Sequence, residues 1–324
     1  MLPASDRQSE AARCRSLISI QDLGPEELRQ MVDEGCALSV RGTDYADALR
    51  GKVVGLYFRQ PSTRTRTSFF VAVHRMGGVS IQYGPGDLQL ENGESIGDTA
   101  MIFDQVLDSL VVRTNGPESE LRALAGGSRN LAVINALSQG EHPTQAIADL
   151  ITIQQEFGSL AGRHILYIGA ANNTSGSLLL AASRIPGLQI TMVEPVELRS
   201  PAPLVELARA NARQSGAVVS LLDSPDLLPA PVDVVYTARW QSMGKEPAVP
   251  HWRTLLAKWR VDVRLMERVS GKDTIFMHDL PASRGDEVTD AVMDGSRSRI
   301  RQQANNKTIS AMVTLKKTVA MTEI

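Results

Sequence analysis

Residues 53–73 read VVGLYFRQPSTRTRTSFFVAV, and the fold class can be inferred from them. The stretch opens with a short apolar run, residues 53–58, which has the length of one buried β-strand. A second apolar run follows from Phe69, and the proline and hydroxyl residues between the two runs are typical of a helix start. A buried strand that leads through a turn into a helix is the first half of a βαβ unit. The stretch therefore predicts an α/β fold with a parallel sheet.

Short strand-like runs and longer helix-like runs alternate over almost the whole chain, as they do in doubly wound parallel sheets. Strands are expected at Val53–Phe58, Val79–Tyr83, Ser109–Val112, Leu131–Asn135, His164–Ile168, Gln189–Val193, Val218–Leu222, Val232–Tyr236 and Thr274–Met277. Helices are expected to begin near Pro25, Thr65, Glu94, Pro117, Pro143, Thr174, Pro203, Val261 and Gln302. The α/β prediction therefore extends to the entire sequence.

The chain has 324 residues, enough for two domains of ordinary size. A helix that begins at Pro143 should stop at Phe157, because Gly158 suits a helix C-terminus. This helix is a plausible connector between two parallel sheets. We therefore expect a first domain at residues 1–142, a second at residues 143–300, and a final helix at residues 301–324 that packs back on the first domain.

Composition excludes several classes of protein. Lys and Arg number 34 and Asp and Glu 36, for a net charge of −2, which gives no overall electrostatic reason to bind nucleic acid or an anionic membrane. No apolar run approaches the roughly 20 residues that span a bilayer, and no targeting segment is visible. Cys14 and Cys36 are the two cysteines, too few for a disulfide framework or a Cys-based zinc site. We expect a soluble, cytoplasmic protein.

The turn at residues 61–68 concentrates hydroxyl and guanidinium groups at a helix N-terminus. Unsatisfied backbone N–H groups and the positive end of the helix dipole attract anions there, and the guanidinium groups of Arg64 and Arg66 match phosphate oxygens. The segment is therefore interpreted as an anion cradle. The plainer alternative is an ordinary N-cap at Ser62 or Thr63 with two solvated arginines.

The same run resembles the Ser-Thr-Arg-Thr-Arg signature of the aspartate/ornithine carbamoyltransferase family. Further signatures of that family follow in order, within residues 17–315: Arg113 at a strand end, His142-Pro143-Thr144-Gln145 for His-Pro-x-Gln, Met277-His278-Asp279-Leu280-Pro281 for His-x-Leu-Pro, and Gln303-Ala304-Asn305-Asn306-Lys307 for a Gln-Ala-Glu-Asn-Arg-like segment. The resemblance implies carbamoyl transfer, with carbamoyl phosphate bound by the first domain and an amine acceptor by the second. It implies no metal and no other cofactor.

By this resemblance, carbamoyl phosphate is bound by Ser62, Thr63, Arg64, Thr65, Arg66, Gln89, Arg113, His142, Gln145 and Lys307. Arg64, Arg113 and His142 are the expected catalytic residues, because the reaction needs donors for the oxyanion that forms and cations for the departing phosphate. Read without its neighbours, His142 would be a helix-start residue with a satisfied ring.

Residues 89–99 resemble the family's loop that reaches into the site of the neighbouring subunit. The resemblance implies a homotrimer with shared active sites. Without the family, the same residues would be a surface loop followed by a helix that carries Glu94 and Asp98 near its start.

On the acceptor side, the motifs resemble the ornithine branch of the family. Asn92 stands where aspartate carbamoyltransferases have a lysine, residues 240–244 match a Ser-Met-Gly loop of ornithine carbamoyltransferases, and Asn172–Asn173 resembles a pair that holds an amino-acid carboxylate. The acceptor residues implied by the resemblance are Asn172, Asn173, Ala238, Ser242, Met243, Asp279 and Leu280.

Three departures from that branch favour a changed acceptor. Ala238 replaces an aspartate that pairs with the α-ammonium of ornithine, and Asp279 replaces a cysteine beside the reacting amine. In the final segment, Asn305 and Lys307 replace a glutamate and an arginine. Because loss of the carboxylate at position 238 leaves the ammonium of ornithine poorly paired, we predict an ornithine-related acceptor in specialised metabolism, such as 2,3-diaminopropionate, a diamine or a modified ornithine.

Three alternatives remain open at this point. Ornithine itself is the first, with L-citrulline as the product. A binding-only pseudoenzyme is the second, since several family positions have changed. A nucleotide-dependent dehydrogenase is the third, and it rests on residues 169–176 after a strand, which lack the G-x-G-x-x-G spacing.

Overall fold

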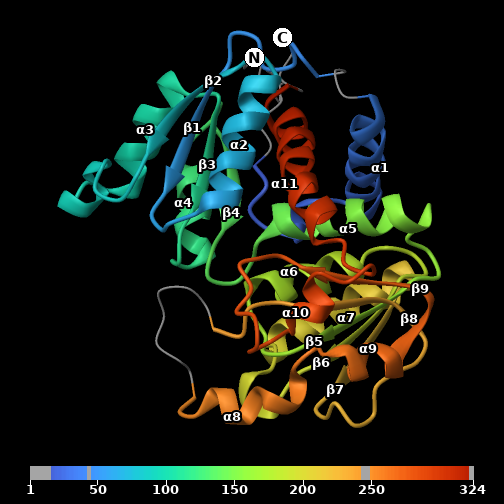
Figure 1. The fold of residues 1–324 in the computed structure, drawn as a ribbon. Coiled ribbons are helices and arrows are strands. Elements are labelled where there is room, and N and C mark those ends of the chain that lie inside the picture. Colours follow the sequence, from blue (N-terminus) through green and yellow to red (C-terminus); the bar gives the residue numbers. More distant parts are fainter. Residues whose placement is uncertain (1–15, 42–44, 242–248, 321–324) are drawn as a thin grey trace, which may run out of the picture.

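The structure is a computed structural model that describes residues 16–41, 45–241 and 249–320. Two parallel sheets form the centres of two α/β units, and the long helix α5 (Pro143–Phe157) runs between them (Figure 1). Pro143 occupies the first turn of α5, and Gly158 ends the helix with a φ of 74°, a left-handed conformation that favours glycine. The predicted fold class, two doubly wound parallel-sheet units joined by a connector helix, is confirmed.

The first sheet contains β1 (Val53–Phe58), β2 (Val79–Tyr83), β3 (Ser109–Arg113) and β4 (Ala132–Leu137) in the order β2-β1-β3-β4. All neighbouring strands are parallel. The chain adds β2 on one side of β1 and then returns to form β3 on its other side. In sheets of this type, ligands bind where the direction reverses, at the carboxyl ends of the strands. The ends of β1 and β3 therefore mark one wall of a site.

Helices cover both faces of the first sheet: α1 (Pro25–Arg41), α2 (Thr63–Arg75), α3 (Ile96–Val106) and α4 (Glu118–Gly126). Successive side chains of a strand point to opposite faces. Leu56 and Phe58 accordingly belong to the core shared with α1 and α2, whereas Tyr57 packs with residues of α3 and α4.

The second sheet contains β5 (His164–Ile168), β6 (Gln189–Val193), β7 (Val218–Leu222), β8 (Val232–Thr237) and β9 (Ser270–His278) in the order β7-β6-β5-β8-β9, again with parallel neighbours. Its helices are α6 (Asn173–Ala182), α7 (Ala202–Ser215), α8 (Trp252–Leu256), α9 (Val263–Val269) and α10 (Asp290–Met293). The direction reverses between β5 and β8, so their carboxyl ends mark the opposite wall of the site.

The last helix, α11 (Ile300–Leu315), returns to the first unit and continues as a π-helical turn at Lys316–Ala320. It contacts α1, α2 and α5, and it stands beside α1 and α2 in Figure 1. This return was predicted. Short 3₁₀ turns, η1 (Ile20–Asp22), η2 (Gln89–Asn92), η3 (Val196–Leu198) and η4 (Ala257–Trp259), complete the described elements.

The expected strands are all present, with small differences at their ends. β9 begins at Ser270, whereas the predicted start was Thr274. The prediction missed the first residues of this strand because they are polar and show no apolar pattern. Helices α8 and α10 were not predicted, since five and four residues are too few to show a 3.6-residue period. Within the described residues, no helix has the length and apolar character to cross a membrane.

Candidate active site

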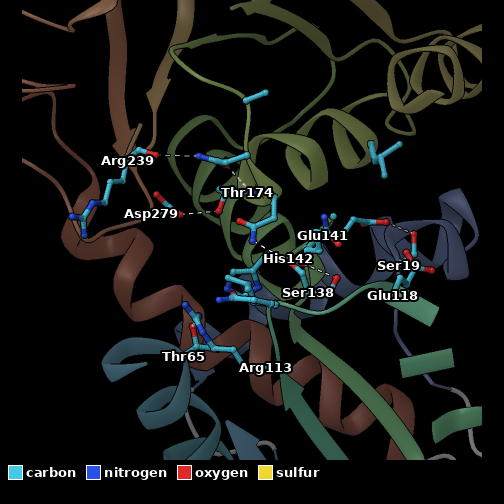
Figure 2. Close-up of a pocket in the computed structure, with 18 of the residues that line it drawn as sticks. Ser19, Thr65, Arg113, Glu118, Ser138, Glu141, His142, Thr174, Arg239 and Asp279 are labelled. Carbon is cyan, nitrogen blue, oxygen red and sulfur yellow. Dashed lines mark hydrogen bonds between the residues drawn. The ribbon is translucent and has the colours of Figure 1, made fainter. Parts of the chain in front are cut away.

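A cavity of about 1240 Å³ lies between the two units, at the carboxyl ends of β1, β3, β5, β8 and β9. Figure 2 shows side chains from both units around it. Of the predicted site residues, those that line the cavity are Ser62, Thr63, Arg64, Thr65, Arg113, His142, Asn172, Asn173, Asp279, Leu280 and Lys307. Strand ends that are far apart in the sequence thus meet at the position that the two sheet orders predict.

The N-terminus of α2 forms part of the wall on the first unit. Ser62 precedes this helix, but its side chain makes no capping hydrogen bond. The first backbone N–H groups of α2 can therefore donate hydrogen bonds to a bound anion. Arg64 lines the cavity half-buried; burial lowers the pKa of its guanidinium and Asp279 offsets part of that decrease. The plainer interpretation, a capped helix start with two solvated arginines, does not describe this arrangement.

Arg113 ends β3 and is 7% exposed. Its Nη1 donates a 3.4 Å hydrogen bond to Thr65 Oγ1, and its buried Nε has no acceptor among the described residues. Burial lowers the pKa of Arg113 to about 10, Asp279 offsets part of the decrease, and the charge of Arg64 adds to it. A buried cation with a free N–H beside a second cation is suited to bind an anion.

His142 precedes the first turn of α5 and is 3% exposed. Its backbone N–H donates to Ser177 Oγ at 2.7 Å, and its Nδ1 lies 3.4 Å from Thr144 Oγ1. Burial lowers the pKa of His142 well below its ordinary value, and the nearby charges of Lys307 and Arg113 lower it further. The imidazole is therefore neutral at physiological pH and can serve as a hydrogen-bond donor without adding charge.

Lys307 reaches the cavity from α11, and Gln145 lies behind it on α5. Lys307 Nζ donates to Gln145 Oε1, and Gln145 Nε2 donates to Asp149 Oδ1 at 2.7 Å. Burial lowers the pKa of Lys307 to about 8, while Asp279 and Asp149 oppose the decrease. The lysine thus places a third cation near Arg64 and Arg113.

The opposite wall belongs to the second unit. Asn172 Oδ1 accepts hydrogen bonds of 2.9 Å from the backbone N–H groups of Thr174 and Ser175 and so caps α6, while Asn173 Nδ2 donates to the backbone oxygen of Ser138 at 3.1 Å. Asp279 Oδ2 accepts a 2.8 Å hydrogen bond from Thr174 Oγ1. In Figure 2 the Asp279 carboxylate points toward Thr174.

Comparison with known proteins identifies the family. The carbamoyl-P binding domain model of aspartate/ornithine carbamoyltransferase matches residues 15–155, and the Asp/Orn binding domain model matches residues 161–317. The chain belongs to the aspartate/ornithine carbamoyltransferase family. It is a carbamoyltransferase, and the family assignment replaces the dehydrogenase interpretation of residues 169–176.

Relatives of this carbamoyltransferase resemble it over nearly their whole length. An ornithine carbamoyltransferase of Hyperthermus butylicus is 38% identical over 299 residues, 90% of this chain and 93% of the relative. One of Gloeobacter violaceus is 39% identical over 293 residues, 90% of this chain and 91% of the relative. The solved ornithine carbamoyltransferase of Pyrococcus furiosus superimposes with a TM-score of 0.88 at 32% identity, covering 96% of this chain and 99% of that one.

Several predicted site residues of the carbamoyltransferase do not line the cavity. Arg66 turns to the ring of Phe58, with its Cζ 5.5 Å from the ring centroid. Ala238 is 1% exposed within the core. Gln89 is exposed on η2 and accepts a hydrogen bond from Asn92. Ser242 and Met243 lie outside the described residues.

Four further polar residues at or behind the cavity were not predicted as site residues: Arg239, Asp149, Tyr236 and Gln303. Arg239 lines the cavity. The other three form one buried hydrogen-bonded group behind Gln145. The available signal was spacing: position 149 follows Gln145 by four residues, and position 303 precedes Lys307 by four, so each pair shares one helix face.

No group of three or more His, Cys, Asp or Glu residues suited to a metal ion occurs in the described ranges.

Proposed function

We propose that this carbamoyltransferase moves the carbamoyl group of carbamoyl phosphate to the side-chain amine of L-ornithine, giving L-citrulline and phosphate. The observation that supports the proposal is the charge arrangement of the cavity. Arg64, Arg113 and Lys307 line one side, and Asn172 and Asp279 line the other. An anionic donor suits the first wall and an amino-acid acceptor suits the second. The relatives described above carry the name ornithine carbamoyltransferase, which favours ornithine as the acceptor.

On the donor side, we assign the phosphate to the N–H groups at the start of α2 and to Arg64. Helix N-termini and guanidinium groups are suited to phosphate oxygens. Thr65, Arg113 and His142 are assigned to the carbonyl oxygen, where negative charge develops as the amine attacks. The half-buried and buried environments of Arg64 and Arg113 strengthen these interactions, because little water competes for the cations.

The reaction needs no nucleophile from the protein. The neutral amine of the acceptor attacks the carbamoyl carbon, a C–N bond forms, and the C–O bond to phosphate breaks. The phosphate leaves with the electron pair and accepts the proton that the amine loses. The neutral His142 fits this scheme, since it can donate a hydrogen bond to the developing oxyanion while the cations neutralise the phosphate.

A second candidate acceptor is a diamino acid shorter than ornithine, a diamine or a modified ornithine, in specialised metabolism. Ala238 and Asp279 favour it. Ala238 offers no carboxylate for an α-ammonium, whereas Asp279 brings a carboxylate to the cavity and holds it through Thr174. An acceptor with its ammonium nearer the carbamoyl carbon would pair with Asp279 instead.

The assembly and domain roles are part of the same proposal. Residues 1–142 with 301–324 bind carbamoyl phosphate, and residues 143–300 bind the acceptor. Three copies associate in the cytoplasm, and the exposed Gln89 of each copy completes the cavity of its neighbour. Its position outside its own chain's cavity supports a role in the adjacent site.

An acceptor screen tests the proposal. The purified protein is incubated with carbamoyl phosphate and, in parallel, with L-ornithine, 2,3-diaminopropionate and putrescine, and both phosphate and the ureido product are measured. The largest kcat/KM is expected for ornithine. A larger value for 2,3-diaminopropionate or putrescine selects the second candidate. Amine-independent phosphate release with no ureido product from any amine would contradict the proposed function.

A further inference from the structure

The carboxylate of Asp149 stands at the centre of a buried hydrogen-bond network. It lies on α5, one helical turn after Gln145, and has no solvent exposure. Three side chains donate to it: Gln145 Nε2 at 2.7 Å, Gln303 Nε2 at 2.7 Å, and the Tyr236 hydroxyl at 3.1 Å. These donors come from α5, α11 and β8, so one carboxylate joins the connector, the returning helix and the second sheet.

The amide of Gln145 is held at both of its ends. Its Nε2 donates to Asp149, and its Oε1 accepts from Lys307 Nζ. Burial raises the pKa of Asp149 to about 7, and above that pH its carboxylate can only accept, whereas the ammonium of Lys307 can only donate. In the reversed orientation, the amide oxygen would face the carboxylate and the amide N–H would face the ammonium. The chemistry of the two partners therefore sets the orientation of the amide.

The network continues to the acceptor wall. Gln303 Nε2 also lies 3.1 Å from the Tyr236 hydroxyl, and Gln303 Oε1 accepts a 2.9 Å hydrogen bond from the backbone N–H of His278. His278 ends β9 and directly precedes Asp279. The amide of Gln145, which the family resemblance assigns to carbamoyl phosphate, is thus connected through buried hydrogen bonds to the ends of the strands that carry the acceptor residues.

We propose that Asp149 is a positioning residue for carbamoyl transfer, which orients the Gln145 amide and ties it through Gln303 and Tyr236 to the acceptor wall. Neither Asp149 nor Gln145 lines the cavity, whereas Lys307 does and donates to Gln145 Oε1. Asp149 therefore acts through Gln145 and Lys307 and not on the substrate. The inference rests on the proposed function, because the orientation of Gln145 affects turnover only if the cavity binds carbamoyl phosphate.

The substitution Asp149→Asn tests the inference. Asparagine has nearly the same shape, but it loses the charge and replaces one acceptor oxygen by a donor, so the Gln145 amide is no longer held in one orientation. We expect kcat/KM for carbamoyl phosphate to fall about tenfold, because a factor of this size corresponds to the loss of roughly one hydrogen bond to a charged group. The control is Thr152→Val on the same helix.

Thr152 is a matched control because it joins the same two helices without contact to Gln145. Its Oγ1 accepts a 2.9 Å hydrogen bond from Asn306 Nδ2 and donates to the backbone oxygen of Ala148 at 2.7 Å. Thr152→Val should lower the thermal unfolding midpoint modestly and leave kcat/KM for carbamoyl phosphate at the wild-type value.

The pH profile separates positioning from a merely structural role. Besides burial, four charged groups act on the pKa of Lys307: Asp279 and Asp149 raise it, and Arg113 and Arg64 lower it. His142 also lies near this lysine but is neutral. Without the Asp149 carboxylate, Lys307 loses its proton at lower pH. The alkaline decrease in kcat/KM for carbamoyl phosphate should therefore move to lower pH in Asp149→Asn and stay in place in Thr152→Val.

Tyr236→Phe keeps the inference testable if Asp149→Asn does not fold, since it removes only one donor to the carboxylate. It should lower kcat/KM for carbamoyl phosphate in the same direction by a smaller factor. Suppose that the wild-type enzyme is active, and that the folded Asp149→Asn and Tyr236→Phe variants show wild-type kinetics and an unchanged pH profile. The inference is then wrong, while the proposed function stands. If the wild-type protein transfers no carbamoyl group, the proposed function fails and this inference fails with it.

Discussion

The hydroxyl of Thr174 donates a 2.8 Å hydrogen bond to Asp279 Oδ2, so the start of α6 holds the carboxylate that follows β9. This carboxylate affects the cations of the first unit. Burial lowers the pKa of Arg64 and of Arg113, and Asp279 offsets part of the decrease in both. The acceptor wall therefore contributes a negative charge to the donor side of the cavity, and substitutions on either wall are expected to affect both substrates.

Arg113→Met is expected to abolish most carbamoyl transfer without destabilising the fold. Removal of one charged donor to a developing oxyanion costs on the order of 10²–10³ in rate. The guanidinium is buried with its Nε unpaired, and apolar replacement of such a buried charge is often neutral or stabilising. Turnover and the thermal unfolding midpoint test the two halves of the prediction, and wild-type turnover by Arg113→Met or by Arg64→Ala would contradict the site assignment.

Lys307 predicts a pH dependence of both affinity and stability. Burial lowers its pKa from 10.5 to about 8, so the KM for carbamoyl phosphate should rise as the pH passes about 8 and the ammonium is lost. At a pH between about 8, the pKa of Lys307 in the folded chain, and 10.5, its ordinary pKa, the lysine of the unfolded chain holds a proton that the folded lysine has released. Unfolding then takes up a proton, and the contribution of this group to the free energy of unfolding increases with pH across that interval.

Lys307→Arg is the matched variant for this prediction. The guanidinium stays charged throughout the range, so the KM for carbamoyl phosphate should no longer rise above pH 8. Steady-state kinetics and urea unfolding at a series of pH values provide the measurement. A wild-type KM that does not change with pH on the alkaline side would show that Lys307 makes no charged contact with the donor.

Most of the fold was predictable because the central strands of both sheets are buried on both faces. Such strands read as nearly continuous apolar runs, and Val53–Phe58 and His164–Ile168 match their observed bounds. β9 is the exception at its polar start, where Ser270 pairs with Val232 before a register shift. That pairing depends on the neighbouring strand and leaves no local pattern in the sequence.

The cavity was predictable where a motif ends a strand, as at Arg113, but the network behind it was not. Asp149 and Tyr236 are 87 residues apart and meet only because α5 lies against the end of β8. The four-residue spacing from Gln145 to Asp149 places them on one helix face, but it does not reveal which donors the carboxylate finds. Such partners are set by tertiary packing, which the sequence does not show directly.

Active-site sharing predicts complementation between inactive variants. Arg113→Ala disables the cavity of its own chain, and Gln89→Ala is expected to weaken the cavity of a neighbour. Subunit exchange between the two should yield some cavities with a native Arg113 and a native Gln89, and activity should partly return. Exchange is verified by mass spectrometry of differently tagged chains. No recovery after verified exchange would count against a shared site.

The acceptor prediction follows from the placement of charge on the second wall. Ala238 offers no carboxylate and is buried beside Arg239, whose backbone oxygen accepts a 3.4 Å hydrogen bond from Asn172 Nδ2. Asp279 supplies a carboxylate from the other side of the wall. If Asp279 pairs with the acceptor ammonium, Asp279→Cys should lower kcat/KM for the preferred amine. Adding Ala238→Asp should then raise kcat/KM for ornithine.

If an aspartate at position 238 reaches the acceptor as Asp279 does, both positions act on one ligand and the two substitutions should be non-additive. A double-mutant cycle on kcat/KM, measured with ornithine and with 2,3-diaminopropionate, gives the coupling directly. Ala238→Asp alone is the control, since it adds a carboxylate at the buried position 238, which does not line the cavity, and leaves Asp279 in place. If the unmodified enzyme uses ornithine efficiently, ignores the shorter amino acid and the diamine, and shows no coupling, then Ala238 and Asp279 are tolerated substitutions. The second candidate acceptor is in that case wrong, and the Asp279 carboxylate serves only to balance the cations across the cavity.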